Sequence, residues 1–292
     1  MLRPPALRSG DSVAIVAPAS PFDRASFERG LELLSTRYRP VFSPGLFESS
    51  RYLAGSDSRR QRELAEALES PEVRAVFCAR GGYGAMRLLE GLKLPHANKL
   101  LVGFSDITAL HGAFQAAGRV SVHGPVVTQL GALGARVAEP LFRLLESPSE
   151  RPVLRGTPVT GGQAEGPVVG GNLSVLTRLL GTPFMPALDG AILFFEDVTE
   201  RPYRLDRMWH HLALAGAFRR VAGLALGTFT GCDDKDLAGE QVIRELASAT
   251  GLPCVMGLPA GHGDDNQPFA LGARARLDGD EGTLSFLEGA VA

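Results

Sequence analysis

Ser105 occupies a place in the sequence where a serine can act as a nucleophile. The stretch "KLLVGFSDITALHGAF" (99–114) predicts a buried strand at 100–102 and an amphipathic helix at 107–114, with Ser105 at their junction. A tight strand-to-helix turn can raise a serine hydroxyl above a sheet as a nucleophile elbow. A helix N-cap is the alternative, because serine is among the best residues there. The usual elbow has a glycine two residues after the serine, where this chain has Ile107, so the stretch alone leaves both interpretations open.

A serine nucleophile needs a base, and His262 is the best placed of the six histidines. It lies in "GLPAGHGDDNQPFALG", a polar loop directly after an apolar segment. Loops held by a rigid sheet are where catalytic residues concentrate, although an exposed loop histidine is the plain alternative. His111 lies six positions after Ser105 on the same predicted helix and therefore points away from it. His210 and His211 are adjacent on a predicted helix and cannot face one another.

Glu196 is the candidate for the acid that orients the base. It ends the apolar strand "AILFF" in "AILFFEDVTERPYRLDRM". A carboxylate in that position either lies at a solvated strand end or engages a partner. Asp197 is expected to point to the opposite face of the strand, and Glu200 is interpreted as a solvated charge at a helix start.

The glycines of "FCARGGYGAM" form the third candidate element. Gly81, Gly82 and Gly84 follow a predicted strand and precede a helical segment. Glycine lets backbone N–H groups approach a ligand closely, so the turn is a candidate phosphate cradle or oxyanion hole, and a tight strand-to-helix turn is the plain alternative. The GGxG spacing after the third strand does not fit a dinucleotide fingerprint. Arg80, just before the turn, is a candidate cation for a substrate carboxylate.

The elements that must position these residues alternate along the first half of the chain. Apolar segments with strand character occur at 12–20, 39–44, 73–79 and 99–104. Segments with helical spacing follow them at 22–37, 56–70, 84–92 and 107–118. This alternation predicts an α/β fold with a parallel, doubly wound sheet. Ligands bind such sheets at the carboxyl ends of the strands, which is where Ser105 and the glycine turn fall.

The second half is predicted to form another α/β unit. Periodicity is lost after a helix near 138–146, and Pro, Gly and Ser accumulate. Strands are expected at 191–197, 221–229 and 253–259, helices at 171–181, 202–218 and 241–251, and a hairpin at 273–288. We therefore expect an N-terminal domain (1–148), a linker (149–163) and a C-terminal domain (164–292), with a cleft between the domains.

The composition is that of an ordinary soluble globular protein, with 292 residues, 45% hydrophobic and 21% charged residues. A formal net charge of −2 gives no reason to expect a nucleic acid or an anionic membrane as partner. No apolar run approaches the roughly 18 residues of a membrane helix, and the N-terminal apolar stretch suits a first strand better than a signal sequence. The three cysteines include no CxxC and no HExxH pair is present, so we expect neither a disulfide framework nor a zinc site. A cytoplasmic protein is predicted.

Six motifs taken together resemble a known family. "RGGYG", "GFSDIT", "VHGP", "GGNL", "LFFEDVTERPYRLDRM" and "GHGDDNQPFALG" occur in an order and spacing similar to the LD-carboxypeptidases. That family comprises the muramoyltetrapeptide carboxypeptidases of murein recycling and the related microcin C self-immunity peptidases. The resemblance extends from residue 11 to residue 272, nearly the whole chain, and six ordered motifs are far more specific than one.

The resemblance implies a role for each candidate residue. It implies that Ser105 is the nucleophile, Glu196 the acid and His262 the base, with oxyanion N–H groups from Asp106 and Gly82. It implies a flavodoxin-like N-terminal half that carries the serine, a C-terminal α/β half that carries Glu and His, and a homodimer. The loop "GHGDDNQPFALG" has Pro-Phe-Ala-Leu where recycling enzymes commonly have Leu-Pro before the final glycine, which affects the expected loop shape and not the histidine.

The implied reaction is hydrolysis of the amide between an L-configured centre, typically of meso-diaminopimelate, and a terminal D-alanine. The substrate is then a murein tetrapeptide or a related small peptide, no metal or cofactor is required, and Arg80 and Gly81 are the predicted substrate-binding residues. Three alternatives stay open: a peptidase acting on a peptidyl- or aminoacyl-nucleotide antibiotic, a non-enzymatic phosphate- or nucleotide-binding protein, and an amidase with Cys78 as nucleophile.

Overall fold

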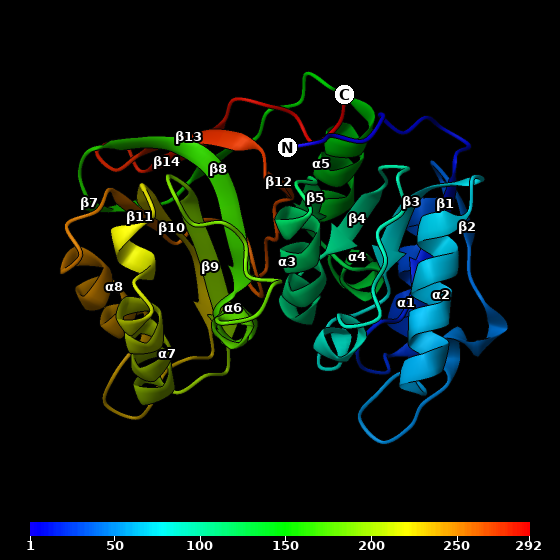
Figure 1. Cartoon of the computed structure of the whole chain (residues 1–292), viewed down its shortest axis with the longest axis horizontal. Helices are drawn as coiled ribbons and strands as arrows, with labels where there is room; N and C mark the ends of the chain where they lie inside the picture. Colours follow the sequence, from blue (N-terminus) through cyan, green and yellow to red (C-terminus); the bar gives the residue numbers. More distant parts are fainter.

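The computed structural model describes residues 1–292 and contains two β-sheets (Figure 1). One is built from the first half of the chain and one late strand, and the other from the second half. A six-stranded sheet has the order β12-β5-β4-β3-β1-β2, and an eight-stranded sheet has the order β6-β14-β13-β8-β9-β10-β11-β7. The two chain ends lie together, because the N–H of Ala292 donates to the carbonyl of Pro4 at 2.9 Å. No helix combines the length and hydrophobicity needed to cross a membrane.

The six-stranded sheet is a doubly wound sheet of flavodoxin-like order, 2-1-3-4-5, with one added strand. Its strands are β1 (Ser12–Val16), β2 (Arg39–Val41), β3 (Val73–Cys78), β4 (Leu100–Gly103), β5 (Ser121–His123) and β12 (Phe269–Leu271). β1 to β5 are parallel, and β12 pairs antiparallel with β5 at the edge. The predicted fold class is confirmed, and the carboxyl ends of β3 and β4 lie side by side as such a sheet requires.

Helices cover both faces of this sheet. One face packs on α1 (Arg24–Ser35), α4 (Val127–Leu133) and α5 (Ala135–Glu146), and the other on α2 (Asp57–Glu69) and α3 (Thr108–Ala116). Short 3-10 turns are η1 (Pro44–Phe47), η2 (Ala85–Leu88) and η3 (Ser105–Ile107). Consecutive strand residues such as Ile15 and Val16 enter opposite cores, which explains why the strands are apolar throughout.

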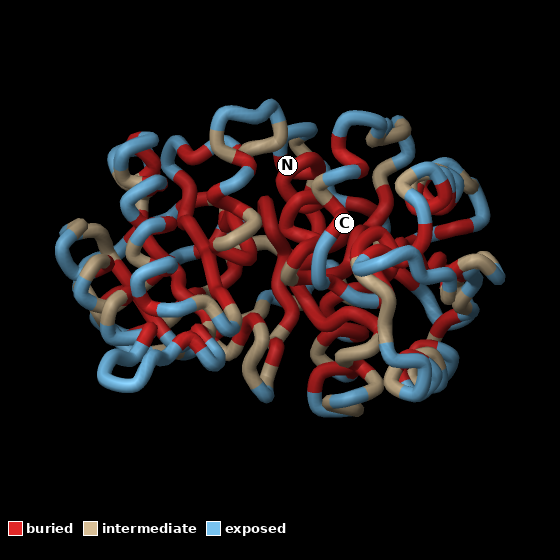
Figure 2. Tube along the Cα trace, turned by 90° about the horizontal axis from the view of Figure 1, so that it is seen from below, coloured by how far each residue is buried: buried red, intermediate tan, exposed pale blue.

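The eight-stranded sheet has a parallel centre and antiparallel edges. Its strands are β6 (Val153–Arg155), β7 (Thr157–Thr160), β8 (Gln163–Asn172), β9 (Ile192–Val198), β10 (Gly223–Thr230), β11 (Cys254–Met256), β13 (Arg274–Asp278) and β14 (Thr283–Phe286). The helical elements are α6 (Leu173–Leu179), α7 (Pro202–Leu214), η4 (Ala217–Arg219) and α8 (Gly239–Ser248). The three α-helices pack on one face, and the other face shares a continuous apolar core with the first sheet. Figure 2 shows this buried interior running between the two halves.

Three segments differ from the sequence-based expectation. Residues 149–163, predicted as a linker, contain β6 and β7, short edge strands whose partners β14 and β11 are distant in sequence. Residues 269–271, predicted as loop, form β12 in the first sheet. Residues 84–92, predicted as helix, hold only the four-residue η2, which lies between Gly84 and Gly91. The N–H of its first residue is bonded to the elbow described below. The division into domains 1–148 and 164–292 stays a prediction.

Candidate active site

Ser105 lies at a strained turn between β4 and α3. Its φ of +65° is in the left-handed region, which side chains other than glycine rarely adopt outside functional sites. Its side chain caps neither η3 nor α3, because the cap residues are Phe104 and Ile107 and neither helix start has a side-chain cap bond. The helix-cap interpretation is therefore wrong for the hydroxyl, which points instead toward a histidine.

Two glycines make room for this turn. A Cβ on Gly103 would lie 3.0 Å from two side-chain carbons of Ile107, so the glycine before the serine accommodates the isoleucine after it. A Cβ on Gly81 would lie 2.8 Å from the Cβ of Ser105, so the turn after β3 approaches the elbow directly. The elbow geometry thus survives without the glycine that usually follows the serine.

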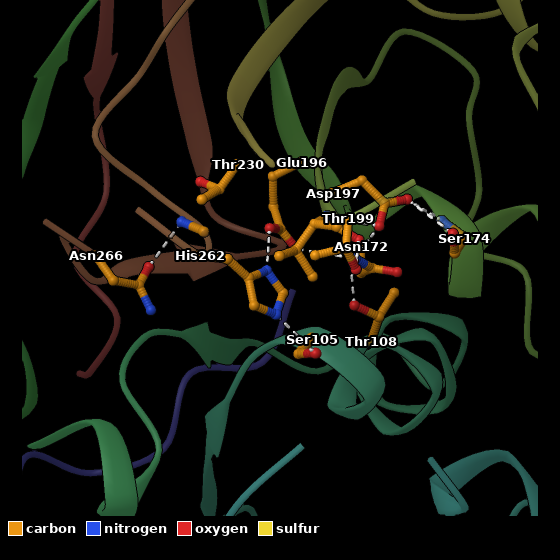
Figure 3. Close-up of polar contacts among 12 residues, drawn as sticks. Ser105, Thr108, Asn172, Ser174, Glu196, Asp197, Thr199, Thr230, His262 and Asn266 are labelled. Atoms are coloured by element: carbon orange, nitrogen blue, oxygen red, sulfur yellow. Dashed lines mark hydrogen bonds and ion pairs between the residues drawn. The ribbon is translucent and has the colours of Figure 1, made fainter. Parts of the chain in front are cut away.

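The His262 imidazole bridges Ser105 and Glu196. Its Nε2 lies 3.0 Å from the Oγ of Ser105, and its Nδ1 lies 2.6 Å from Oε2 of Glu196 (Figure 3). Ser105 comes from the first sheet, Glu196 from β9 of the second, and His262 from the loop after β11. The carboxyl of Glu196 is fully buried and the imidazole is 19% exposed, so the chain of bonds runs from the interior to an open cleft.

The electrostatic surroundings favour a protonated His262. Burial lowers its pKa, but the charge of Glu196 and the hydrogen bond that the imidazole donates to it outweigh burial. Asp197 adds to them, and the net pKa lies above the usual 6.5. The imidazolium that forms when a base takes a proton is therefore stabilised here.

Glu196 and Asp197 share a hydrogen-bond donor that sequence reasoning did not identify. The Asn172 amide donates to Oε1 of Glu196 at 3.3 Å and to Oδ1 of Asp197 at 3.1 Å, although Asp197 was expected to face away. Asp197 also accepts from the N–H and hydroxyl of Ser174. Burial, and then the neighbouring Glu196, raises the pKa of Asp197 to about 6. The "GGNL" motif was the only sequence signal for Asn172.

A second amide positions the loop that carries His262. Asn266, fully buried, accepts a 2.9 Å bond from the Gly261 N–H and donates a 2.8 Å bond to the Gln129 side chain. Gly261 has φ +120°, and a Cβ there would lie 2.6 Å from Oε2 of Glu196. Only glycine therefore fits beside the histidine. Asn266 lies in the motif "GHGDDNQPFALG", but its role depends on tertiary contacts that no local pattern reveals.

Two backbone N–H groups near Ser105 are candidate oxyanion donors, that of Gly82 on the glycine turn and that of Asp106 on the elbow. The Gly82 N–H donates to no acceptor in the chain. The Asp106 carboxylate accepts a 2.8 Å bond from the Ala85 N–H, which ties the elbow to the turn, and burial raises the pKa of Asp106 to about 6. Arg80 is exposed, and its Nη1 donates to the carbonyl of Pro21 at 2.6 Å. No group of His, Cys, Asp or Glu side chains converges in the manner of a metal site.

Two cavities meet at Ser105. The larger, about 620 Å³, is also bordered by Arg80, Gly81, Gln129 and His262. The smaller, about 310 Å³, is also bordered by polar and charged side chains of α6 and of the segment from β9 to α7. His262 borders the larger cavity only. The nucleophile thus stands between two separate binding spaces.

Comparison with known proteins agrees with this arrangement. The LD-carboxypeptidase N-terminal domain matches residues 13–124, and the LD-carboxypeptidase C-terminal domain matches residues 165–277. The chain belongs to the LD-carboxypeptidase family. It is 37% identical to the murein tetrapeptide carboxypeptidase of Pseudomonas aeruginosa over 92% of this chain and 93% of that protein. It is 36% identical to the probable murein peptide carboxypeptidase of Bacillus subtilis over 96% and 93%.

Solved structures extend the likeness to the whole fold. The muramoyltetrapeptide carboxypeptidase from Oxalobacter formigenes superposes with a TM-score of 0.85 at 31% identity, covering 95% of this chain and 98% of that one. The microcin C7 self immunity protein in complex with aspartyl sulfamoyl adenosine gives a TM-score of 0.91 at 22% identity with full coverage of both chains, which is a likeness of fold. The predicted family and α/β architecture are confirmed, and the chain is a carboxypeptidase of this family.

Proposed function

We propose that this protein is a cytoplasmic, homodimeric serine carboxypeptidase of murein recycling that releases the terminal D-alanine of murein tetrapeptide. The bond broken is the amide between the L-centre of meso-diaminopimelate and D-alanine. The observation that carries the proposal is the His262 imidazole held between the Ser105 hydroxyl and the buried Glu196 carboxylate. The names of the murein peptide relatives support the substrate.

In the acylation step, His262 takes the proton of Ser105 while the serine oxygen bonds to the substrate carbonyl carbon. Glu196 holds the ring with Nδ1–H toward itself and stabilises the imidazolium. The N–H groups of Gly82 and Asp106 would donate to the carbonyl oxygen as it becomes an oxyanion, and each such donor contributes roughly 3–4 kcal/mol in comparable sites. His262 then protonates the amine, the C–N bond breaks and D-alanine leaves.

In the deacylation step, His262 takes a proton from water, whose oxygen bonds to the acyl carbon. The bond to Ser105 then breaks, and the proton returns to the serine oxygen. Because His262 must reach the leaving amine and borders only the larger cavity, D-alanine is assigned to that cavity. Arg80 and Gly81 border the same space, and Arg80 would meet the terminal carboxylate of the peptide.

Two other interpretations have less support. A phosphate bound at the glycine turn would be stabilised by the positive N-terminal end of a following α-helix. Here the turn is followed only by η2, a 3-10 turn of four residues. Cys78 is fully buried in β3, and burial raises the pKa of its thiol, which opposes a thiolate nucleophile. A peptidyl- or aminoacyl-nucleotide substrate is the alternative for the same catalytic residues.

The test is D-alanine release from L-Ala-D-Glu-meso-diaminopimelate-D-Ala by the wild type and by Ser105→Ala. Release by the wild type alone is expected. Equal release by both proteins would remove Ser105 from the mechanism. No release by either, with release of amino acid from an aminoacyl-nucleotide by the wild type, would favour the alternative substrate.

A further inference from the structure

The smaller cavity beside Ser105 carries opposite charges that the catalytic steps do not use. Arg178 at the end of α6 and Glu200 before α7 both border it. They form no ion pair with each other, and no Arg178 nitrogen lies within 4.0 Å of a carboxylate. Two opposite charges that border one cavity without pairing with each other suit a ligand with both an ammonium and a carboxylate group.

Glu200 retains capacity for a further donor. Its Oε1 accepts from the Ser174 hydroxyl at 3.2 Å. Its Oε2 is buried and forms an ion pair with Nε of Arg204 at 3.0 Å, so Oε1 is the oxygen with capacity for a further donor. A carboxylate oxygen can accept more than one hydrogen bond, so Oε1 can accept from a ligand as well as from Ser174.

Arg178 is also only partly engaged. Its Nη1 donates to the Ser174 carbonyl at 2.5 Å and to the Thr177 hydroxyl at 3.1 Å, which holds the side chain along α6. Its Nε and Nη2 donate to no acceptor in the chain, and the residue is exposed. A guanidinium anchored by one nitrogen can still present two N–H groups to a carboxylate.

The acyl part of the substrate must occupy this cavity if the leaving amino acid occupies the other. Ser105 borders both, so a peptide bonded to the serine oxygen extends from one space into the other. Figure 3 shows Ser174 and Asn172 on one side of the imidazole and Asn266 on the other. Met86, Val175 and Val198 add apolar surface for a methylene chain.

We propose that the smaller cavity recognises the free amino-acid group at the side-chain end of diaminopimelate. Glu200 accepts from its ammonium and Arg178 donates to its carboxylate. This inference rests on the proposed function. It assigns the choice between diaminopimelate and lysine to Arg178, because lysine carries the ammonium but not the carboxylate.

Three synthetic tetrapeptides that differ only at the third residue test the assignment. That residue is meso-diaminopimelate, meso-diaminopimelate amidated at its side-chain carboxyl, or L-lysine. We expect wild-type kcat/KM to be about 10- to 100-fold higher for the free carboxylate than for the other two, the range of one charge-assisted contact. Arg178→Gln is expected to lose this preference, and Glu200→Gln to lower kcat/KM for all three peptides.

The controls separate the failure of this inference from failure of the proposed function. Arg62→Gln removes an exposed arginine of α2 that borders neither cavity and is expected to keep the wild-type preference. Wild-type cleavage of all three peptides at equal rates, or an Arg178→Gln variant that keeps the preference, would overturn the inference and leave the proposed function intact. No D-alanine release from any peptide would overturn both. Calorimetric binding of the tripeptide product to Ser105→Ala, with and without Arg178→Gln, checks the same contact without turnover.

Discussion

Thr108 and Asn172 join the two halves of the molecule through one buried hydrogen bond. The Asn172 N–H donates to the Thr108 hydroxyl oxygen at 2.8 Å. Thr108 starts α3, three residues after Ser105, and the Asn172 side chain contacts Glu196. A Cβ on Gly171, whose φ is +145°, would lie 2.3 Å from the same hydroxyl, so only glycine allows this approach. The contact therefore joins the helix that follows the nucleophile to the residue that bonds the acid.

Replacing Thr108 with valine keeps the shape of the side chain but removes the acceptor. We expect the free energy of unfolding to fall by about 1–3 kcal/mol, because a buried N–H is left without a partner. We also expect kcat to fall, because the serine and the acid are no longer held at their working distance. Urea denaturation and D-alanine release measure the two effects. The exposed Thr36→Val should keep wild-type kcat, and an unchanged kcat in Thr108→Val would show that this bond does not govern the site.

Local sequence patterns were sufficient to predict the strand ends at which the catalytic candidates lie. Glu196 stands out because a carboxylate directly follows five apolar residues, and Ser105 because a strand meets a helix without a turn. Such features depend on neighbours in the chain, so they are readable before the fold is known. The roles of the residues came from the resemblance of six motifs, not from the spacing of any one.

Contacts between distant segments could not be predicted in the same way. The bond between Thr108 and Asn172 spans 64 residues, and the Asn266 bond to Gln129 spans 137. β12 consists of three residues, too few for a periodic signal, and it pairs with a strand of the other half. These features arise from packing, which a single sequence does not display.

The charge of Glu196 is expected to determine the pH at which kcat/KM rises. His262 acts as a base only when neutral, so kcat/KM should rise with pH through the His262 pKa, which lies above 6.5. Glu196→Gln removes the charge that raises this pKa, so the acid limb should move to lower pH. We also expect kcat to fall roughly 10³- to 10⁴-fold, because the amide no longer selects the correct tautomer. A pH series of kcat/KM measures both, with exposed Glu66→Gln as control. An acid limb at the same pH would assign it to a group other than His262.

Gly81 is expected to tolerate no side chain, because the nucleophile occupies the space. Its Cβ would lie 2.8 Å from the Cβ and 3.1 Å from the Oγ of Ser105. Gly81→Ala should therefore displace the serine and lower kcat, with a loss of about 1–3 kcal/mol in unfolding free energy. Gly118→Ala is the control for backbone strain without a steric clash. Its φ of +70° is unfavourable for alanine, but the added Cβ would have no atom within 4 Å. Similar stability in the two variants with wild-type kcat in both would contradict the steric argument.

The three cysteine thiols are expected to be unreactive and unnecessary for activity. Cys78, Cys232 and Cys254 are all fully buried, and burial raises the pKa of Cys232 and of Cys254 to about 12. Thiolates are the reactive form, so iodoacetamide at neutral pH should leave D-alanine release unchanged. Mass spectrometry of the intact protein reports the extent of labelling. Inactivation in proportion to modification of Cys78 would instead support Cys78 as the nucleophile.

Arg80 is expected to select peptides with a free terminal carboxylate. One of its nitrogens is engaged by the Pro21 carbonyl, which positions the guanidinium at the larger cavity and leaves its other donors for a ligand. Arg80→Ala should raise KM for the tetrapeptide about 10- to 100-fold, the effect of one lost charge-assisted contact. A substrate that ends in D-alaninamide separates recognition from structural damage. The wild type should cleave it poorly, and Arg80→Ala should cleave it about as well as the wild type does, because the carboxylate is already absent. An equal loss on both substrates would mean that Arg80 shapes the glycine turn rather than binding the peptide end.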